Sequence, residues 1–390
     1  MSGKQGVCVL GATGSIGTST LDVIARHQEK FELIAISANS NVDKMLEICH
    51  QHRPKIAVMV DEISADELDK KLELDIKIES GPRALDAIAT LDTVDYVMAA
   101  IVGDAGLSSA LAAIRAGKNL LLANKESLVM SGQIFMAELA KSKARLVPID
   151  SEHNAIFQCL PDDFTIGSEL KGVKRILLTG SGGPFLNSDI KSLDAKTPAE
   201  AISHPNWDMG AKISVDSATM MNKGLEWLEA KWLFGIADQA LQIVIHPQSI
   251  IHSMVEFVDG SILAQLGKSD MRIPIAHAFG LPQRIKSGVA GLDFYDLPEL
   301  QFKKPDLDRF PCLRLAEESW QRGGTATTVL NAANEVAVEK FLQGKIKFTK
   351  IARIIEDTLT DMQIEDILSL EQVLTADKAA RFMAQEKARQ

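Results

Sequence analysis

The amino-acid sequence predicts an α/β protein built from an N-terminal doubly wound, Rossmann-type domain, a central α+β domain and a C-terminal helical domain. Short apolar runs alternate with amphipathic helical segments as far as residue 150, and this alternation then stops. Helical spacing without strand-like runs marks the last part of the chain. A chain of 390 residues also exceeds one ordinary hydrophobic core, so we expect several domains.

The N-terminal runs have the length and residue types of buried strands. Strand–helix alternation predicts a mostly parallel sheet over residues 1–150, and ligands of such sheets bind beyond the carboxyl ends of the strands. The predicted strands lie in GVCVLGA, FELIAISA, KIAVMV, IKIES, DYVMAA, NLLLAN and RLVPID.

Residues 151–280 have a mixed pattern, which predicts an α+β domain. The strand-like KRILLTG precedes a polar stretch that ends near residue 211, a helix is predicted over 218–232, and Asp259-Gly260 joins two β-like runs as a hairpin turn. Residues 281–306 are rich in proline and read as a connecting segment. The helical spacing of Ile351, Ile354 and Leu359 predicts a helical domain over residues 307–390.

Composition narrows the function classes. A formal net charge of −10 argues against broad binding to nucleic acid or to an anionic membrane, because both require a basic face. The four cysteines are far apart, as in reduced cytosolic proteins. Apolar runs are too short to span a membrane, and the run Val7 to Leu10 is too short for a signal peptide. We therefore expect a cytoplasmic protein.

A glycine-rich turn follows the first predicted strand. Gly11, Gly14 and Gly17 open the next helix in GATGSIG, and this strand–turn–helix context predicts a dinucleotide site. The second strand ends in Asn39-Ser40-Asn41, without the acid that commonly binds the ribose of NAD. NADP is therefore favoured, although the turn also lacks a basic residue for the 2′-phosphate.

Two carboxylates follow the last strand of the first domain. If the chain stays extended, Asp150 and Glu152 project to one side and Ser151 to the other, so that a cation such as Mg²⁺ or Mn²⁺ is needed between the acids. The alternative is a helix start in which Asp150 or Ser151 is the capping residue. The local sequence by itself favours this second interpretation.

Other polar groups have an ordinary and a functional interpretation. Lys125, at the carboxyl end of a strand, is either a solvated surface charge or part of a site. Asn222, Lys223 and Glu226 share one face of the predicted helix, where the ordinary alternative is a Lys–Glu pair. Ser181, in GSGGPF, begins either an anion-binding loop or a flexible one.

Taken together, these segments resemble the 1-deoxy-D-xylulose 5-phosphate reductoisomerase family. The resemblance covers essentially the whole chain and rests on long segments in the same order. They are GATGSIGTSTLDV, AAIVGDAGL, LLANKESLV, PIDSEHNAIFQCL, LTGSGGPF, HPNWDMGAKISVDSATMMNKGLE and HPQSIIHSMVEF.

The resemblance implies a central catalytic domain with one divalent cation held by three acids, Asp150, Glu152 and Glu226. It makes these acids and Lys125 catalytic, and it makes residues 181–211 a lid over the substrate. The implied substrate contacts are Lys125, Ser151, Glu152, Ser181, His204, Trp207, Ser217, Asn222, Lys223 and Glu226.

The resemblance further implies NADPH as the cofactor. Many members of the family carry a basic residue where this chain has Ser40. The resemblance therefore supports a nicotinamide cofactor more strongly than it supports a preference for NADPH over NADH. The implied contacts are Thr13, Gly14, Ser15, Ile16, Asn39, Ser40, Asn41, Asn124, Glu126 and Gly210.

The implied reaction has two steps. The cation is chelated by the carbonyl and adjacent hydroxyl of 1-deoxy-D-xylulose 5-phosphate, so that a carbon–carbon bond breaks and re-forms to give a branched aldehyde. Hydride from the nicotinamide then gives 2-C-methyl-D-erythritol 4-phosphate. The family is typically homodimeric. The alternatives are a metal-independent NADP-dependent dehydrogenase of the homoserine dehydrogenase type and a redox-sensing regulator that binds NADP(H) without turnover.

Overall fold

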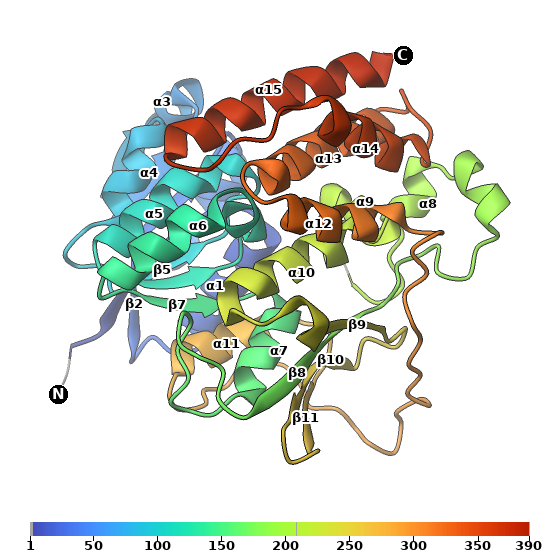
Figure 1. Cartoon of the computed structure of the whole chain (residues 1–390). Coiled ribbons are helices and arrows are strands. Elements are labelled where there is room, and N and C mark those ends of the chain that lie inside the picture. The colour runs from blue at the N-terminus through green and yellow to red at the C-terminus, as the bar shows by residue number, and fades with distance from the viewer. Residues whose placement is uncertain (1–2, 208, 390) are drawn as a thin grey trace.

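The computed structural model describes residues 3–207 and 209–389. In Figure 1 the N-terminal sheet and its helices lie beside the C-terminal helices, and the smaller second sheet lies beneath both. Within the described ranges, no helix combines the length and the apolar character needed to cross a bilayer.

The first part of the described chain forms a seven-stranded parallel sheet in the order β4-β3-β2-β1-β5-β6-β7. This result confirms the doubly wound fold, and every predicted strand is present. The strand order reverses between β1 and β5, which is where such sheets bind ligands. The strands are β1 (Gln5–Leu10), β2 (Phe31–Ala38), β3 (Ile56–Met59), β4 (Lys77–Ser80), β5 (Tyr96–Ala99), β6 (Asn119–Leu122) and β7 (Arg145–Pro148).

Helices connect these parallel strands. Their buried faces carry apolar residues at helical spacing, such as Leu21 and Ile24 of α1, and these join the same core as the strands. The helices are α1 (Ser15–Ala25), α2 (Val42–His52), α3 (Glu62–Lys71), α4 (Pro82–Ala89), the short η1 (Asp104–Gly106), α5 (Leu107–Arg115) and α6 (Lys125–Lys141).

The chain leaves the sheet before the two acids, contrary to the extended arrangement described above. Strand β7 ends at Pro148, and α7 (Ser151–Cys159) begins with Asp150 as its N-cap residue. The Asp150 carbonyl already accepts the first intrahelical bond, from the Asn154 N–H at 2.9 Å. The helix-start interpretation was therefore right about the backbone, and the expectation that Ser151 points to the opposite side of a strand from Glu152 was wrong.

The second sheet has four strands among the described residues, in the order β11-β10-β8-β9. Strand β8 (Val173–Gly180) pairs parallel with β9 (Leu241–Ile245) and antiparallel with β10 (Ile251–Phe257). Strands β10 and β11 (Ile262–Leu266) form the expected hairpin around Asp259-Gly260. Strand β11 is an edge strand.

Helical segments join β8 to β9. The predicted helix over 218–232 corresponds to α10, which begins only at Met221 because Met220 has a left-handed backbone with φ 62° and separates α10 from α9. The segments are η2 (Ile190–Ala195), α8 (Pro198–Ile202), α9 (Ala211–Ala218), α10 (Met221–Phe234) and η3 (Asp238–Ala240).

The last described part of the chain is helical, as the sequence predicts. Helix α11 (Arg272–Gly280) packs against α1, and its Phe279 ring lies 5.0 Å from that of Phe31. The segment before the C-terminal helices is mostly irregular, although Lys303 forms a bridge with Ile245 of β9. The C-terminal helices are α12 (Pro311–Arg322), α13 (Ala326–Leu342), α14 (Lys350–Asp361) and α15 (Leu370–Arg389).

Gly17 tests the close packing of the glycine-rich turn. A Cβ atom at Gly17 would lie 2.3 Å from the Gly11 carbonyl oxygen, whereas one at Gly14 would lie 3.5 Å from the same atom. We expect Gly17→Ala to lower the free energy of unfolding by about 1–3 kcal/mol, because rigid backbone leaves no room for the methyl group. Urea denaturation of the ligand-free protein measures the change. The matched control, Gly14→Ala, changes stability by less than about 0.5 kcal/mol, and equal effects of the two would contradict the packing argument.

Candidate active site

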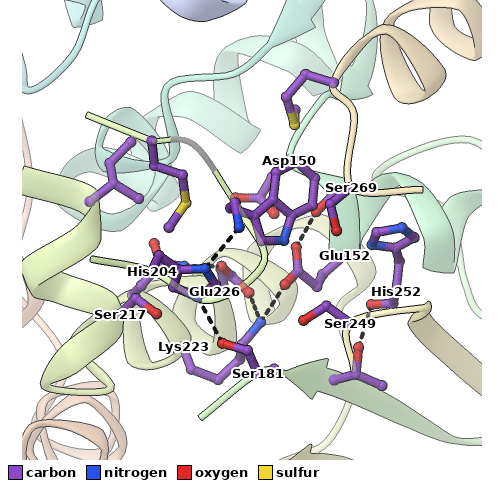
Figure 2. Close-up of a pocket in the computed structure, with 18 of the residues that line it drawn as sticks. Asp150, Glu152, Ser181, His204, Ser217, Lys223, Glu226, Ser249, His252 and Ser269 are labelled. Atoms are coloured by element: carbon purple, nitrogen blue, oxygen red, sulfur yellow. Dashed lines mark hydrogen bonds and ion pairs between the residues drawn. The ribbon is translucent and has the colours of Figure 1, made fainter. Parts of the chain in front are cut away.

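One cavity of about 330 Å³ lies between the carboxyl edge of the first sheet and the second sheet. Its wall combines residues that are far apart in the sequence: Ser15 and Ile16 from α1, Asp150 and Glu152 around the start of α7, and Glu226 from α10. Figure 2 shows the two glutamates on either side of the Lys223 ammonium group, with Ser181 and His204 beside them. Fold topology thus assembles the polar groups at the expected edge.

The predicted acids meet in this cavity. Oxygen atoms of Asp150, Glu152 and Glu226 all lie within 4.8 Å of one another. Asp150 and Glu152 come from the start of α7, and Glu226 is brought to them by α10. Since like charges at this distance repel, such a cluster requires positive charge.

Two buried lysines supply that charge in the protein. Lys125 Nζ lies 2.5 Å from Asp150 Oδ2 and 3.3 Å from Glu226 Oε1. Lys223 Nζ lies 2.9 Å from Glu152 Oε1 and also pairs with Glu226. Lys125 is therefore a buried member of the acid cluster and not a solvated surface charge.

Burial and neighbouring charges shift the acids in different directions. Burial and the Glu152 carboxylate raise the pKa of Glu226 to about 6, against the opposing effect of Lys223 and Lys125. Burial alone would raise the pKa of Asp150 as well, but Lys125 and His153 hold it well below its ordinary value. The cluster thus contains one acid that stays ionised and one that titrates near neutrality.

The donor set fits a hard divalent cation. It presents carboxylate oxygens from three side chains at one side of a cavity, which suits Mg²⁺ or Mn²⁺ better than a thiophilic metal. Glu226 is almost completely buried, so its negative charge requires a neighbouring positive charge. Lysine provides this charge here, and a divalent cation provides the same compensation.

A histidine and a further acid, which the sequence analysis missed, lie behind this cluster. His153 Nε2 donates to the Glu226 carbonyl oxygen at 2.8 Å, because a carbonyl only accepts. Its Nδ1 atom faces Asp150 at 3.5 Å and Glu229 at 3.4 Å. Burial raises the pKa of Glu229. These buried groups orient Asp150 and the backbone of Glu226 from outside the cavity wall.

The loop after β8 approaches the end of α9 closely. A Cβ atom at Gly183 would lie 2.4 Å from the Ser217 carbonyl oxygen, so only glycine permits this approach. Ser181 accepts a bond from the Gly183 N–H at 3.1 Å. Ser181, Ser217 and the residues Asn222 and Lys223 at the start of α10 all line the cavity.

Part of segment 181–211 lines the cavity, with residue 208 outside the described residues. His204 bonds to Ser181 at 3.0 Å through Nε2, and its Nδ1 atom accepts from the Trp207 N–H at 3.0 Å. The Trp207 ring lies edge-on to His252, with centroids 6.0 Å apart. Every substrate contact implied by the family resemblance is in the cavity wall.

The residues proposed for the cofactor are distributed more widely. Among those described, Ser15, Ile16 and Gly210 line the cavity. Asn124 caps α6 and also donates to the Gly103 carbonyl at 2.9 Å. Glu126 pairs with Lys212 at 2.8 Å. Thr13 and Gly14 lie in the glycine-rich turn, while Asn39, Ser40 and Asn41 lie exposed after β2, where Asn41 caps α2.

Several other residues of the cavity wall have no local signal in the sequence. Ser249 has φ 50° and accepts a bond from Asn206 at 3.1 Å. His252 is buried and bonds to the Gly267 carbonyl, and it also lines the cavity. Ser269 and Met271 join the wall before α11. These residues could be identified only by their position next to strand ends. That position is known only when the order of the strands in the sheets is known.

The fold and the cavity define a class of enzyme. Its members have a doubly wound domain of the dinucleotide-binding type, and a carboxylate-rich site lies at the carboxyl edge of that domain's sheet. Family models agree over most of the chain. Residues 7–132 match 1-deoxy-D-xylulose 5-phosphate reductoisomerase. Residues 146–234 and 266–383 match its C-terminal domain models.

Curated proteins and solved structures of the same name are similar over nearly full length. The protein of Methylococcus capsulatus is 54% identical over 98% of each chain, and that of Shewanella halifaxensis is 56% identical over 97% of each. A crystal structure of DOX-P reductoisomerase with NADPH, fosmidomycin and magnesium has a TM-score of 0.94 at 47% identity, covering 99% of this chain and 98% of that one. The Zymomonas mobilis enzyme with NADPH has a TM-score of 0.91 at 45% identity, covering 99% of both chains. This chain belongs to the 1-deoxy-D-xylulose 5-phosphate reductoisomerase family.

The pKa of Glu226 predicts how cation binding depends on pH. Protons and the cation compete for the same oxygens, so a carboxyl group with a pKa of about 6 loses cation affinity as the pH falls through that value. We expect the apparent Kd for Mg²⁺ to rise between about pH 7.5 and about pH 5. Isothermal titration calorimetry measures it. An unchanged Kd across this range would contradict the assignment of Glu226 as a ligand.

Proposed function

We propose that this chain converts 1-deoxy-D-xylulose 5-phosphate to 2-C-methyl-D-erythritol 4-phosphate, using NADPH and a divalent cation, in non-mevalonate isoprenoid precursor synthesis. The observation that carries this proposal is the meeting of three carboxylates with the dinucleotide-type edge in one cavity. A metal-independent dehydrogenase of the homoserine type is not favoured, because it has no use for three convergent acids. A regulator without turnover is disfavoured for the same reason.

The acids and lysines have separate proposed roles. Asp150, Glu152 and Glu226 hold the cation, and magnesium in the related crystal structures supports Mg²⁺, with Mn²⁺ as an equally hard alternative. When bound, the cation supplies Lewis-acid polarisation of the substrate carbonyl, and NADPH supplies the hydride. Lys125 remains charged, because its neighbouring carboxylates overcome the effect of burial and raise its pKa well above the ordinary value. It is thus placed to orient a substrate oxygen by donating a hydrogen bond.

The remaining polar wall of the cavity binds the substrate. Ser181, Ser217, Asn222 and Lys223 hold the phosphate, and Ser151 faces the sugar beside Glu152. His204 and Trp207 close over it as part of the lid formed by residues 181–211. Water exclusion by this lid strengthens each of these electrostatic contacts.

NADPH binding is proposed along the carboxyl edge of the first sheet. The glycine-rich turn would hold the diphosphate at Thr13, Gly14 and Ser15, with Ile16 beside it, and the exposed turn Asn39-Ser40-Asn41 would face the 2′-phosphate. Asn124, Glu126 and Gly210 complete the proposed set. The domain division follows from these roles: residues 1–150 for NADPH, 151–280 for catalysis, 281–306 as a connection and 307–390 as a helical domain.

We also propose a cytoplasmic homodimer without nucleic-acid or membrane partners. All four cysteines are buried free thiols, which suits a reducing compartment. The edge strand β11 exposes Ile262 and Leu263, and Val258 precedes it with 74% of its surface exposed. An exposed apolar edge strand favours pairing with a second copy.

Glu226→Gln tests the cation site. The amide keeps the shape but removes an anionic ligand, so turnover of 1-deoxy-D-xylulose 5-phosphate falls at least about a hundredfold while the Kd for NADPH stays within about twofold. NADPH oxidation is followed with and without added Mg²⁺. The same assay with NADH in place of NADPH compares the two rates and so measures cofactor preference. Glu138→Gln, on the outer face of α6, is the control. Full activity of Glu226→Gln in metal-stripped buffer would refute the cation assignment.

Leu263→Asp tests the dimer. A charge on the exposed edge of β11 opposes strand pairing, so light scattering is expected to show the mass of one chain for this variant and of two for the unaltered protein. Ile63→Asp, at an apolar position on α3 that is 79% exposed against 51% for Leu263, leaves the dimer intact. A single-chain mass for the unaltered protein would contradict the proposal.

A further inference from the structure

Lys212 bridges two buried carboxylates outside the cavity wall. It lies in the first turn of α9, directly after the lid segment. Its Nζ atom lies 2.8 Å from Glu126 Oε1 and 2.9 Å from Asp216 Oδ2. Glu126 is 5% exposed and Asp216 is 1% exposed, so both depend on this ammonium group for charge compensation.

Helix α13, one of the C-terminal helices, also contacts this bridge. Asn334 of α13 donates from Nδ2 to Asp216 Oδ1 at 2.8 Å, and it is completely buried. Thr327 and Thr328, on the same helix, donate to the carbonyls of Val129 and Met130 at 2.7 and 2.8 Å. These carbonyls lie where α6 bends, next to the non-helical Ser131. Helix α13 therefore holds both helices that Lys212 connects.

The two connected helices carry residues of the active site. The first turn of α6 places Lys125 in the cavity and Glu126 on Lys212. Helix α9 has Gly210 as its N-cap residue and Ser217 near its other end, and both line the cavity. A displacement between α6 and α9 would thus separate the cofactor side of the cavity from the phosphate side.

We propose that Lys212 is a positioning residue, which fixes α9 against the first turn of α6 and so sets the distance between the cofactor and phosphate ends of the cavity. This inference rests on the proposed binding of NADPH and a sugar phosphate there. Asn334 acts with it by holding Asp216 in place. Neither side chain contacts the reacting groups, and their effect passes through Glu126, Asp216 and the helices that carry them.

The ion pair between Lys212 and Glu126 persists near neutral pH. Burial by itself would lower the pKa of Lys212, but Asp216 and Glu126 raise it well above its ordinary value. Burial by itself would raise the pKa of Glu126, but Lys212 keeps it below its ordinary value. Both groups of this pair therefore stay charged during an assay near neutral pH.

Lys387 of α15 provides a matched control away from the cavity and the lid. Its side chain is 22% exposed, against 21% for Lys212, and it pairs with Asp361 of α14. Asp361 is 49% exposed at its side chain, so loss of this pair leaves no buried charge. The two lysines are thus equally exposed, and they differ in the burial of the carboxylates that they contact.

The experiment compares Lys212→Met, Lys212→Arg and Lys387→Met as full-length enzymes. We expect Lys212→Met to raise KM for both NADPH and the sugar phosphate by roughly tenfold, with a smaller change in kcat, because binding geometry is lost across the cavity. The Mg²⁺ requirement stays unchanged, since the metal acids do not touch Lys212. Lys212→Arg restores both KM values to within about threefold, because a guanidinium group also reaches two carboxylates. Lys387→Met stays within about twofold of the unaltered enzyme.

A lowered melting temperature with unchanged KM values in Lys212→Met would overturn the proposal, because it would show a role in stability alone. If Lys212→Met does not fold, Asn334→Ala decides, since it keeps both ion pairs: raised KM values for both ligands support the proposal, and unchanged values overturn it. NADPH affinity is also measured by fluorescence without the sugar phosphate. A wild-type protein without turnover would contradict the proposed function, whereas equal NADPH affinity in wild type and Lys212→Met would contradict only the role of Lys212.

Discussion

The repulsion among Asp150, Glu152 and Glu226 is the constraint on which the rest of the site depends. Their oxygens lie within 4.8 Å of one another, and the three side chains are only 10%, 17% and 1% exposed. Such a cluster is stable only with positive charge among its members, and Lys125 and Lys223 bring that charge from different helices. Removing one partner of a buried ion pair costs about 3–5 kcal/mol, so the acids and lysines constrain one another's positions.

This electrostatic requirement links the two sheets. Asp150 follows the last strand of the first sheet, whereas Glu226 and Lys223 lie on α10, which packs against α6 and α12. The charged groups therefore meet only when both halves of the molecule are folded. The C-terminal helices take part as well, because α13 supports α6 at its bend and α9 through Asp216. The helices that carry the active-site residues are thus supported by side chains of α13, in the C-terminal part of the chain.

Much of the fold follows from local sequence. Each strand of the first sheet is a short apolar run bounded by turn residues, and the glycine spacing after β1 has a backbone explanation in the close approach at Gly17. The hairpin at Asp259-Gly260 and the C-terminal helices are equally local. Where local reasoning failed, the reason was a backbone detail. The helix predicted over 218–232 begins only after the left-handed Met220, and the strand before Asp150 ends two residues early.

By itself, the sequence determined which elements form and which residue types follow each strand, because these depend on nearest neighbours along the chain. Long shared segments also indicated the family and its three acids. Only the tertiary structure decided that Asp150, at the N-cap position of α7, reaches the acid cluster, since that depends on where α10 lies. It alone placed His153 behind the acids and joined Lys212 to Glu126 and Asn334 to Asp216. Contacts between residues about 80 to 120 positions apart arise from packing, and local spacing carries no signal for them.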